Sequence, residues 1–248
     1  MENKKISKRR KRRSAEDIEN SVFLATEKLV IEKGFKDVTF TEIMKLAGVE
    51  PQVMYRRFDT LEDLFDKFIR RYDYWFIDSV EFNLDEKDPI ASMKNVLTGL
   101  ADSLYKNPIM QQILIWEISD DNKLTIRTAK NRETHSVPML EFFRANLPKN
   151  IDFDCFTSLL IGGIYYLIIH RTQSTFCEID FNKPEGRKLL TDTIEQLIHT
   201  VYKSESINAE IEEVALSLLK QGVDEKAISI STKIPIQTIN KMKQKIKG

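Results

Sequence analysis

The sequence predicts an all-α protein, and three observations support this prediction. Glycine and proline are scarce, at 8 and 7 of the 248 residues. No segment alternates apolar and polar residues over the length of a β-strand. Apolar residues recur instead at helical spacing after Ser/Thr-x-x-acid sequences, which mark helix starts. With 42% hydrophobic residues, the chain is long enough to form one large or two smaller domains.

Charge is distributed unevenly, although the formal net charge is zero. Residues 1–71 contain 17 basic and 13 acidic side chains, residues 72–205 contain 14 and 20, and residues 206–248 contain 7 and 5. A basic beginning followed by an acidic middle is typical of chains that contact nucleic acid at one end. The beginning is densest in "ENKKISKRRKRR", so residues 1–13 are expected to form a disordered basic arm. The arm either tracks phosphates and enters the minor groove or is a solubilising tail.

The predicted helices begin after this arm. A capping box S-x-x-D begins the first helix at Ser14, and Gly34 ends it. A second box, T-x-x-E, begins the next helix at Thr39, and Gly48 ends that one. Both helices carry an apolar stripe on one side, so each is expected to pack against a common core.

A third, short helix is predicted from Pro51 to about Phe58. Proline suits the first position of a helix and keeps the residue before it out of the helical region, so Glu50 becomes the N-cap. Thr60 then begins a fourth helix with a T-x-x-D box, and its apolar stripe continues to about Val80.

The two short helices joined by "AGVE" predict a helix-turn-helix within residues 14–71. Gly48 permits a left-handed turn, and Val49 fills the angle between the helices. The stretch "TFTEIMKLAGVEPQVMYRRFDTLEDLF" resembles the DNA-binding domain of the tetracycline-repressor (TetR) family of bacterial transcription regulators. The resemblance runs from about Ser14 to Phe65. It implies an all-helical homodimer, expected to be a repressor, that binds a palindromic operator and is released by a small molecule.

Three residues depart from the family pattern. Glu50 replaces the usual Ser or Thr, Gln52 replaces a Gly, and Leu61 stands where a Lys normally contacts phosphate. A carboxylate at a helix N-terminus and a lost cation both weaken phosphate binding. They motivate an alternative, a TetR-fold adaptor that no longer reads an operator and acts through a protein partner. The basic arm and the two arginines of the third helix favour DNA binding instead.

The resemblance also implies which side chains meet the DNA. In the third helix, Gln suits adenine, Val a thymine methyl group, and Arg either guanine or phosphate. The alternative for these side chains is a solvated helix face. The expected DNA-binding residues are Arg9, Arg10, Arg12, Arg13, Thr39, Thr41, Gln52, Val53, Tyr55, Arg56 and Arg57.

The middle of the chain, residues 72–204, is expected to form a helical effector-binding and dimerisation domain. Its predicted helices are Asp88–Tyr105, Pro108–Ile118, Leu124–Asn146, Asp152–Ser174 and Pro184–Lys203. Aromatic side chains are expected to line a site for a small, largely apolar effector, although each of them alone would suit a core position. The effector-site candidates are Tyr72, Trp75, Phe76, Tyr105, Trp116, Phe142, Tyr165 and Tyr166.

The segment "LLIGGIYYLIIH" is apolar on all sides and needs more cover than one small domain offers. Together with the helix from Pro184 it is expected to form a dimer interface, where glycines would let a partner backbone approach closely; an internal core helix is the alternative. The expected interface residues are Leu159, Gly162, Gly163, Tyr166, Leu190, Ile194, Leu197 and Ile198.

The sequence offers no catalytic, metal-binding or cofactor pattern. His135, His170 and His199 stand without paired acidic or sulfur ligands, and nothing places a nucleophile beside a base. Two cysteines suit a reducing cytosol. The apolar run Leu159 to Ile169 is too short to cross a bilayer, so a cytoplasmic protein is expected.

Residues 205–248 form a tail that the TetR pattern does not require. A short stripe from Val214 is expected to stop at Gly222, Asp224 to start a second short helix, and Pro235 to lie in the first turn of a third. The order G-V-x-x-x-x-I-S-x-x-T-x-I-P-x-x-T-I is similar to the minimal helix-turn-helix of transposases and resolvases. Because three short helices bury little surface, the tail is expected to dock on the effector domain or a partner subunit, with DNA contact as the alternative.

Overall fold

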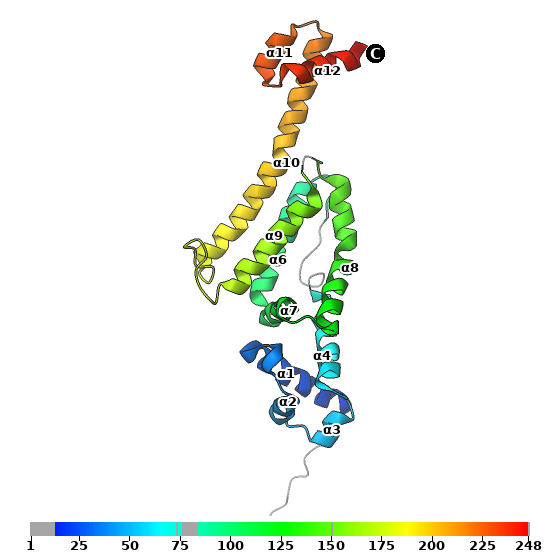
Figure 1. Cartoon of the computed structure of the whole chain (residues 1–248), viewed down its shortest axis with the longest axis vertical. Coiled ribbons are helices and arrows are strands. Elements are labelled where there is room, and N and C mark those ends of the chain that lie inside the picture. Colours follow the sequence, from blue (N-terminus) through cyan, green and yellow to red (C-terminus); the bar gives the residue numbers. More distant parts are fainter. Residues whose placement is uncertain (1–12, 73, 76–83, 150, 248) are drawn as a thin grey trace, which may run out of the picture. The chain divides into compact units, whose positions relative to one another are not determined.

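The computed structural model describes residues 13–72, 74–75, 84–149 and 151–247 (Figure 1). Within them the secondary structure is helical apart from an isolated antiparallel bridge between Phe176 and Ile179, so the all-α prediction is confirmed. The helices are α1 (Ala15–Lys33), η1 (Phe35–Asp37), α2 (Phe40–Ala47), α3 (Pro51–Tyr55), α4 (Leu61–Ile69), η2 (Arg70–Tyr72), α6 (Pro89–Lys106), α7 (Pro108–Ser119), α8 (Lys123–Asn146), α9 (Phe153–His170), α10 (Pro184–Lys220), α11 (Glu225–Thr232) and α12 (Ile236–Lys247).

The chain divides into two compact units that interleave along the sequence. The first unit comprises Met1–Glu81, Gly99–Pro138 and Tyr165–Thr172, and the second comprises Phe82–Thr98, Met139–Ile164 and Gln173–Gly248. Helices α6, α8 and α9 each run from one unit into the other. Helix α8 does so at Pro138, a proline inside the helix, which lacks the N–H needed for the helical ladder.

An aromatic core holds the first unit together. Phe35 of η1 stacks on Trp116 of α7, with ring centroids 4.5 Å apart, and meets Phe65 of α4 edge-on at 5.1 Å. Phe23 of α1 packs against Phe58 and Phe68, and its ring centroid lies 6.0 and 5.9 Å from theirs. Helices α1 and α4 therefore share one core with α7.

Ion pairs add to this core between helices distant in sequence. Asp66 of α4 forms an ion pair with Arg127 of α8, whose Nη2 lies 2.8 Å from Oδ1, and both side chains are about three-quarters buried. Arg132 of α8 pairs with Glu117 of α7, whose side chain is 8% exposed. Removing one partner of such a pair would leave a poorly solvated charge, so α4, α7 and α8 are expected to move together.

The second unit packs α10 against α9 and the beginning of α6. Ile194 and Ile198 of α10 are buried, as is Ile164 of α9. Tyr202 of α10 meets Phe156 of α9 edge-on at 6.0 Å, and burial raises the pKa of Tyr202 to about 12. Helix α10 presents these residues to the unit and leaves its opposite face to solvent.

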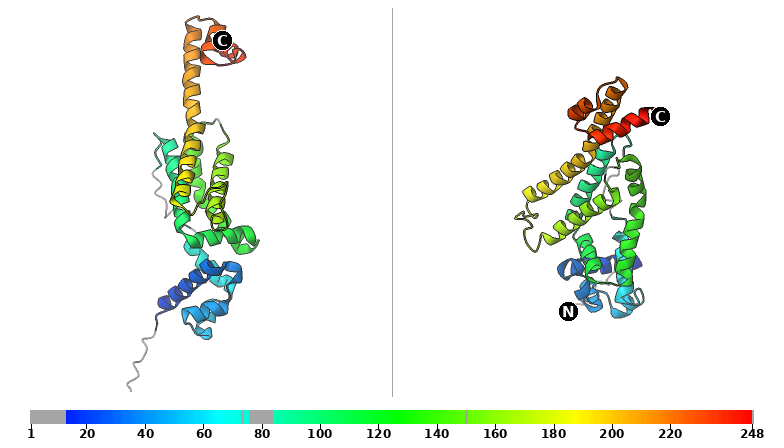
Figure 2. Two further views of the ribbon diagram at one scale, coloured as in Figure 1. Left: turned by 90° about the vertical axis from the view of Figure 1, so that its left-hand side faces the viewer. Right: turned by 45° about the horizontal axis from the view of Figure 1, so that its top comes forward.

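The ends of α4 and α10 are among those that differ from the prediction. Helix α4 ends at Ile69 and tightens into the 3₁₀ turn η2, as helix C-termini often do; residues 76–83, which hold the expected end at Val80, lie outside the described residues. Helix α10 does not end near Lys203 but continues to Lys220 (Figure 2). No glycine or proline lies between Lys203 and Gly222, whose φ of 80° lies in the left-handed region.

Candidate DNA-binding surface

Two of the three capping boxes predicted from the sequence fix the starts of α1 and α2, whereas Thr60 caps α4 without a reciprocal bond. Ser14 accepts the backbone N–H of Asp17, and Thr39 accepts that of Glu42, while each acid accepts the backbone N–H of its cap. Glu42 also accepts Lys33 of α1 at 2.6 Å. The hydrogen bonds from Lys33 and Thr39 lower the pKa of Glu42 to about 2. One carboxylate thus caps α2 and ties it to α1.

The turn between α2 and α3 has the conformation that its sequence predicts. Gly48 is left-handed, with φ 60° and ψ 45°, and Val49 is buried beside it. Arg13, just before α1, donates from Nη1 to the carbonyl oxygens of Ala47 and Gly48, at 3.1 and 3.4 Å. The cation thus satisfies the otherwise unpaired C-terminal carbonyls of α2.

Helix α3 is held by its inner side chains. Met54 is fully buried, and Phe58, four residues on, is 2% exposed. Gln52, Tyr55 and Arg56 lie on the other side of this segment and are exposed to solvent. Val53 is half-buried. The helix is one turn shorter than predicted, because it ends at Tyr55.

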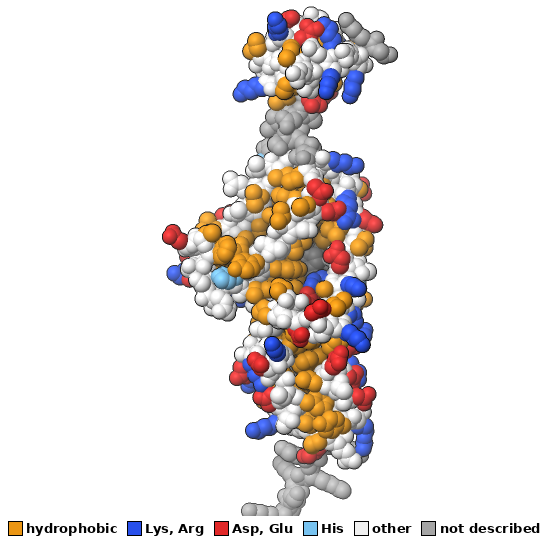
Figure 3. Space-filling view, viewed as in Figure 1, with side chains coloured by type: hydrophobic (Ala, Val, Ile, Leu, Met, Phe, Trp, Pro, Cys, Tyr) orange, Lys and Arg blue, Asp and Glu red, His pale blue; other side chains and the backbone are white. Residues whose placement is uncertain are grey.

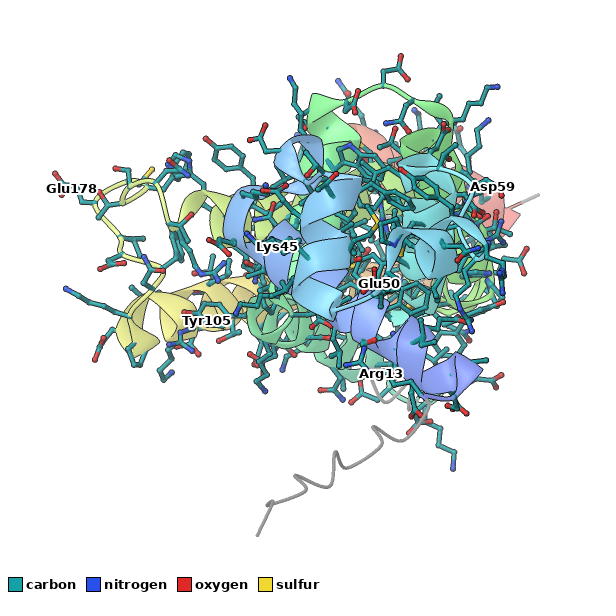
Figure 4. All side chains as sticks on the ribbon, turned by 90° about the horizontal axis from the view of Figure 1, so that it is seen from below. Arg13, Lys45, Glu50, Asp59, Tyr105 and Glu178 are labelled. Carbon is teal, nitrogen blue, oxygen red and sulfur yellow. The ribbon has the colours of Figure 1, made fainter. Side chains whose placement is uncertain are left out.

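Glu50 is the N-cap of α3, as predicted, but it caps through its backbone only. Its carbonyl oxygen accepts the N–H groups of Val53 and Met54 at 2.9 and 3.0 Å, whereas its carboxylate makes no capping hydrogen bond. The side chain is exposed on the face shown in Figure 4, where Arg13 and Lys45 are also labelled.

The two arginines that follow α3 differ in their surroundings. Arg57 is partly buried, with 24% of its side chain exposed, and its Nη1 lies 3.9 Å from Glu19 of α1. Arg56 is exposed and has no ion-pair partner among the described residues. Arg56 is therefore the cation of this segment with full charge available to a ligand.

The threonines lie at the start of α2. Thr39 donates its hydroxyl to Glu42 at 2.6 Å, so the hydroxyl is already committed to the cap. Thr41 is exposed in the first turn. Phe40 packs on Tyr55 at 5.2 Å, which brings the first turn of α2 beside the end of α3.

The predicted DNA-binding residues omit Lys45, and three of the predicted arginines lie outside the described residues. Lys45 is exposed in the last turn of α2, and a lysine opposite the buried Ile43 and Ala47 was the available signal. Arg9, Arg10 and Arg12 lie outside the described residues, as does Phe76 of the predicted effector site.

The other predicted effector residues are spread over the fold. Trp75 and Trp116 are buried, and Trp116 donates its indole N–H to Asp120 at 3.0 Å. Tyr72 is half-buried, and burial raises its pKa to about 12. Tyr105 lies under the Arg171 guanidinium, and burial raises the pKa of Tyr165. These five belong to the first unit, as does the exposed Tyr166, and Phe142 belongs to the second.

An open cleft in the first unit contains only Trp116 of this predicted set. It lies between the end of α1, η1 and α7, and it is lined by Glu32, Lys33, Gly34, Phe35, Lys36, Gln112, Ile115, Trp116 and Ser119.

The predicted interface residues fall on two faces. Leu159, Tyr166 and Leu197 are 71%, 52% and 42% exposed. A Cβ atom added to Gly162 or Gly163 would meet nothing within 4 Å. Leu190 is half-buried. Ile194 and Ile198 are 3% and 0% exposed within one chain, so they belong to its core and not to an outer surface.

Helix α9 is longer than the apolar run that the sequence suggests. Its 18 residues, Phe153–His170, have a mean hydropathy of 1.4 and are long and apolar enough to cross a bilayer by length and composition alone. Within the described part of the chain, no group of three or more His, Cys, Asp or Glu residues is placed to hold a metal ion.

Comparison with known proteins matches this geometry. Residues 23–68 match the family model of bacterial regulatory proteins of the tetR family. A search of curated proteins finds no match.

Solved structures share the fold. The fatty acid degradation regulator FadR of Bacillus halodurans is 15% identical, with a TM-score of 0.57 over 76% of this chain and 96% of its own. A TetR family transcription regulator of Marinobacter aquaeolei VT8 is 16% identical, with a TM-score of 0.54 over 73% and 95%. GusR of Salmonella enterica is 12% identical, with a TM-score of 0.55 over 77% and 98%. The helix-turn-helix and its caps lie within the matched segment, so residues 23–68 are identified as a DNA-binding domain of the kind found in TetR-family transcriptional regulators.

Proposed function

We propose that the chain represses transcription as a homodimer that binds a palindromic operator and is released by a small, largely apolar effector. The observation that carries the proposal is the anchoring of α3. Met54 and Phe58 fix the helix in the core, so Gln52, Tyr55 and Arg56 are exposed together beside the first turn of α2.

A two-fold assembly is supported by an apolar outer surface on α9 and α10. Leu159 on α9 and Leu189 and Leu197 on α10, all in the second unit, are each 42% or more exposed. Figure 3 shows hydrophobic side chains gathered over α9 on the viewed face. Monomeric soluble proteins rarely expose contiguous apolar surface of this kind, so a second copy is the natural cover.

Release by an effector is supported by the shared core of the first unit. Because Phe35 stacks on Trp116, and Asp66 pairs with Arg127, a ligand that shifts α7 or α8 also shifts α1 and α4. Packed cores respond to such shifts by switching between discrete arrangements. The separation of the two recognition helices in a dimer would change accordingly.

The test is salt-dependent binding of the full chain to the DNA upstream of its own gene. Arg56→Ala should weaken binding by about 1–3 kcal/mol if the side chain reads a base. This loss corresponds to a five- to 150-fold increase in Kd. Lys28→Ala, which removes an exposed cation from α1, is the matched control and should change little. If the parent protein fails to bind this DNA at every salt concentration, the result would contradict the proposal and favour an adaptor.

A further inference from the structure

The end of the chain forms a small helical module with its own core. Ala215 and Leu219 of α10, Ile228 of α11 and Ile239 of α12 are buried together. Leu218, Ile234 and Met242 pack around them. Figure 2 shows α11 and α12 folded against the end of α10 in both views. Residues 211–247 are called the C-terminal module below.

Local hydrogen bonds define the turn between α11 and α12. Asp224 caps α11 by accepting the N–H groups of Lys226 and Ala227. Lys233 is left-handed, with φ 60°, and Ser229 donates its hydroxyl to the Ile234 carbonyl at 2.6 Å. Two short helices joined by a tight turn, with a third helix packed across them, have the layout of a helix-turn-helix.

One face of α12 is polar and basic. Ile239 and Met242 point into the module core, which leaves Gln237, Thr238, Lys241, Gln244 and Lys245 exposed. Residues 233–248 contain five lysines and no acidic residue. Lys243 pairs with Glu225, whereas Lys241 and Lys245 have no ion-pair partner among the described residues.

The chemistry of this face suits double-stranded DNA better than a protein. Lysine neutralises phosphates, glutamine can hydrogen-bond adenine, and a threonine methyl can contact thymine in the major groove. Lysine is depleted from the cores of protein interfaces, so this face is a poor protein-docking surface. The acidic residues of the module, Glu212, Glu213, Asp224 and Glu225, all precede α12.

We propose that α12 is a second DNA-recognition helix, so that the chain contacts duplex DNA through α3 and, independently, through α12. For α12 this replaces docking, which the sequence favours for the whole tail, because the buried Ile239 of α12 is already covered within the module. The exposed apolar side chains Val214 and Ile230 lie on α10 and α11. The proposal does not depend on the operator or on a dimer.

The first experiment measures binding of the full chain to a short duplex of unrelated sequence across a range of salt concentrations. Each phosphate contact contributes about 0.9 to the slope of log Kobs against log salt, so Lys241→Ala/Lys245→Ala should make the slope shallower by about 2. Lys220→Ala/Lys226→Ala removes two exposed lysines from α10 and α11 and is the matched control. An unchanged slope, or an equal change in both variants, would overturn the proposal.

A second experiment locates the DNA directly. In a Cys155→Ser/Cys177→Ser background, iron-EDTA attached to Gln237→Cys should cleave bound duplex, whereas the same group on Glu213→Cys of α10 should cleave much less. Cleavage from neither position, or equal cleavage from both, would contradict a recognition role for α12. A change in particle mass on substituting Lys241 and Lys245, with an unchanged salt slope, would show that the module joins protein chains instead.

The outcome is separable from that of the proposed function. Arg56→Ala should reduce discrimination between upstream and unrelated DNA by the same five- to 150-fold while leaving the effect of the α12 lysines intact. The α12 variant should keep that discrimination. If one of these two results is not obtained, only the corresponding proposal is contradicted.

Discussion

The cations of the DNA-binding domain are not equivalent. Arg13 caps the carbonyls of α2, Arg57 lies near Glu19, and Lys33 is held by Glu42. Only part of their charge remains for a phosphate, because hydrogen bonds and ion pairs already compensate it. Arg56 and Lys45 remain exposed. Charge counted along a sequence therefore overstates the charge that a DNA duplex would meet.

Glu42 gives a prediction at the scale of one side chain. Its pKa is about 2 in the folded chain and 4.5 in a free glutamate, so the ionised form is favoured by folding. The stabilisation is present above about pH 4.5 and is lost as the pH falls toward 2. Glu42→Gln should therefore lower the Tm at pH 7, and the difference from the parent should shrink as the pH falls through this window.

Thermal unfolding followed by circular dichroism at several pH values measures this effect. Glu32→Gln, at an exposed position of α1, is the control and should shift the Tm far less at pH 7. A Tm difference that stays constant from pH 7 to pH 2 would show that the carboxylate contributes by some route other than its charge.

At the scale of an element, Gly48 gives a second prediction. A Cβ atom there would meet nothing within 4 Å, so there is room for a side chain. The constraint is the backbone angle φ of 60°, which residues other than glycine rarely adopt. Gly48→Ala should destabilise the chain by about 1–2 kcal/mol. Gly48→Asn should cost less, because asparagine tolerates this conformation. Urea unfolding of the two variants checks the order, and equal losses would mean that the left-handed turn is not what requires glycine.

Local features of the elements could be predicted from the sequence. The caps at Ser14, Thr39 and Thr60 were predictable because a side chain three residues from its partner is placed by the helix alone. The end of α10 was not, because the length of a helix depends on what its faces pack against, and the sequence between Lys203 and Gly222 contains no glycine or proline that marks an end.

Contacts between distant segments could not be predicted. Asp66 and Arg127 lie on different helices far apart in the sequence, and the capping of α2 by Arg13 spans 34 residues. Each depends on how the helices pack. The same reason limited the predicted interface, since helical spacing alone does not say that Ile194 and Ile198 face inward while Leu197 faces outward.

At the scale of the whole molecule, this chain is longer than its structural relatives. FadR of Bacillus halodurans and GusR of Salmonella enterica are covered over 96% and 98% of their lengths, whereas 76% and 77% of this chain is covered. A quarter of the sequence is thus additional to the shared fold. The C-terminal module, with its separate core, shows that a chain of this fold can carry a further folded part.

The proposed dimer leads to the last prediction. Leu159 of α9 is 71% exposed, and a two-fold interface would bury it twice, once in each copy. Leu159→Glu would place two unpaired carboxylates in that interface, at a cost of at least about 3 kcal/mol. A loss of this size raises the dimer dissociation constant by more than about a hundredfold.

Ile118→Glu is the matched control, because Ile118 is 83% exposed on α7 and outside this face. Sedimentation should show the parent and Ile118→Glu as dimers and Leu159→Glu as a monomer with an unchanged circular dichroism spectrum. The monomer should also bind a two-half-site operator no more tightly than a single half-site, whereas a monomeric parent would rule out the α9–α10 interface.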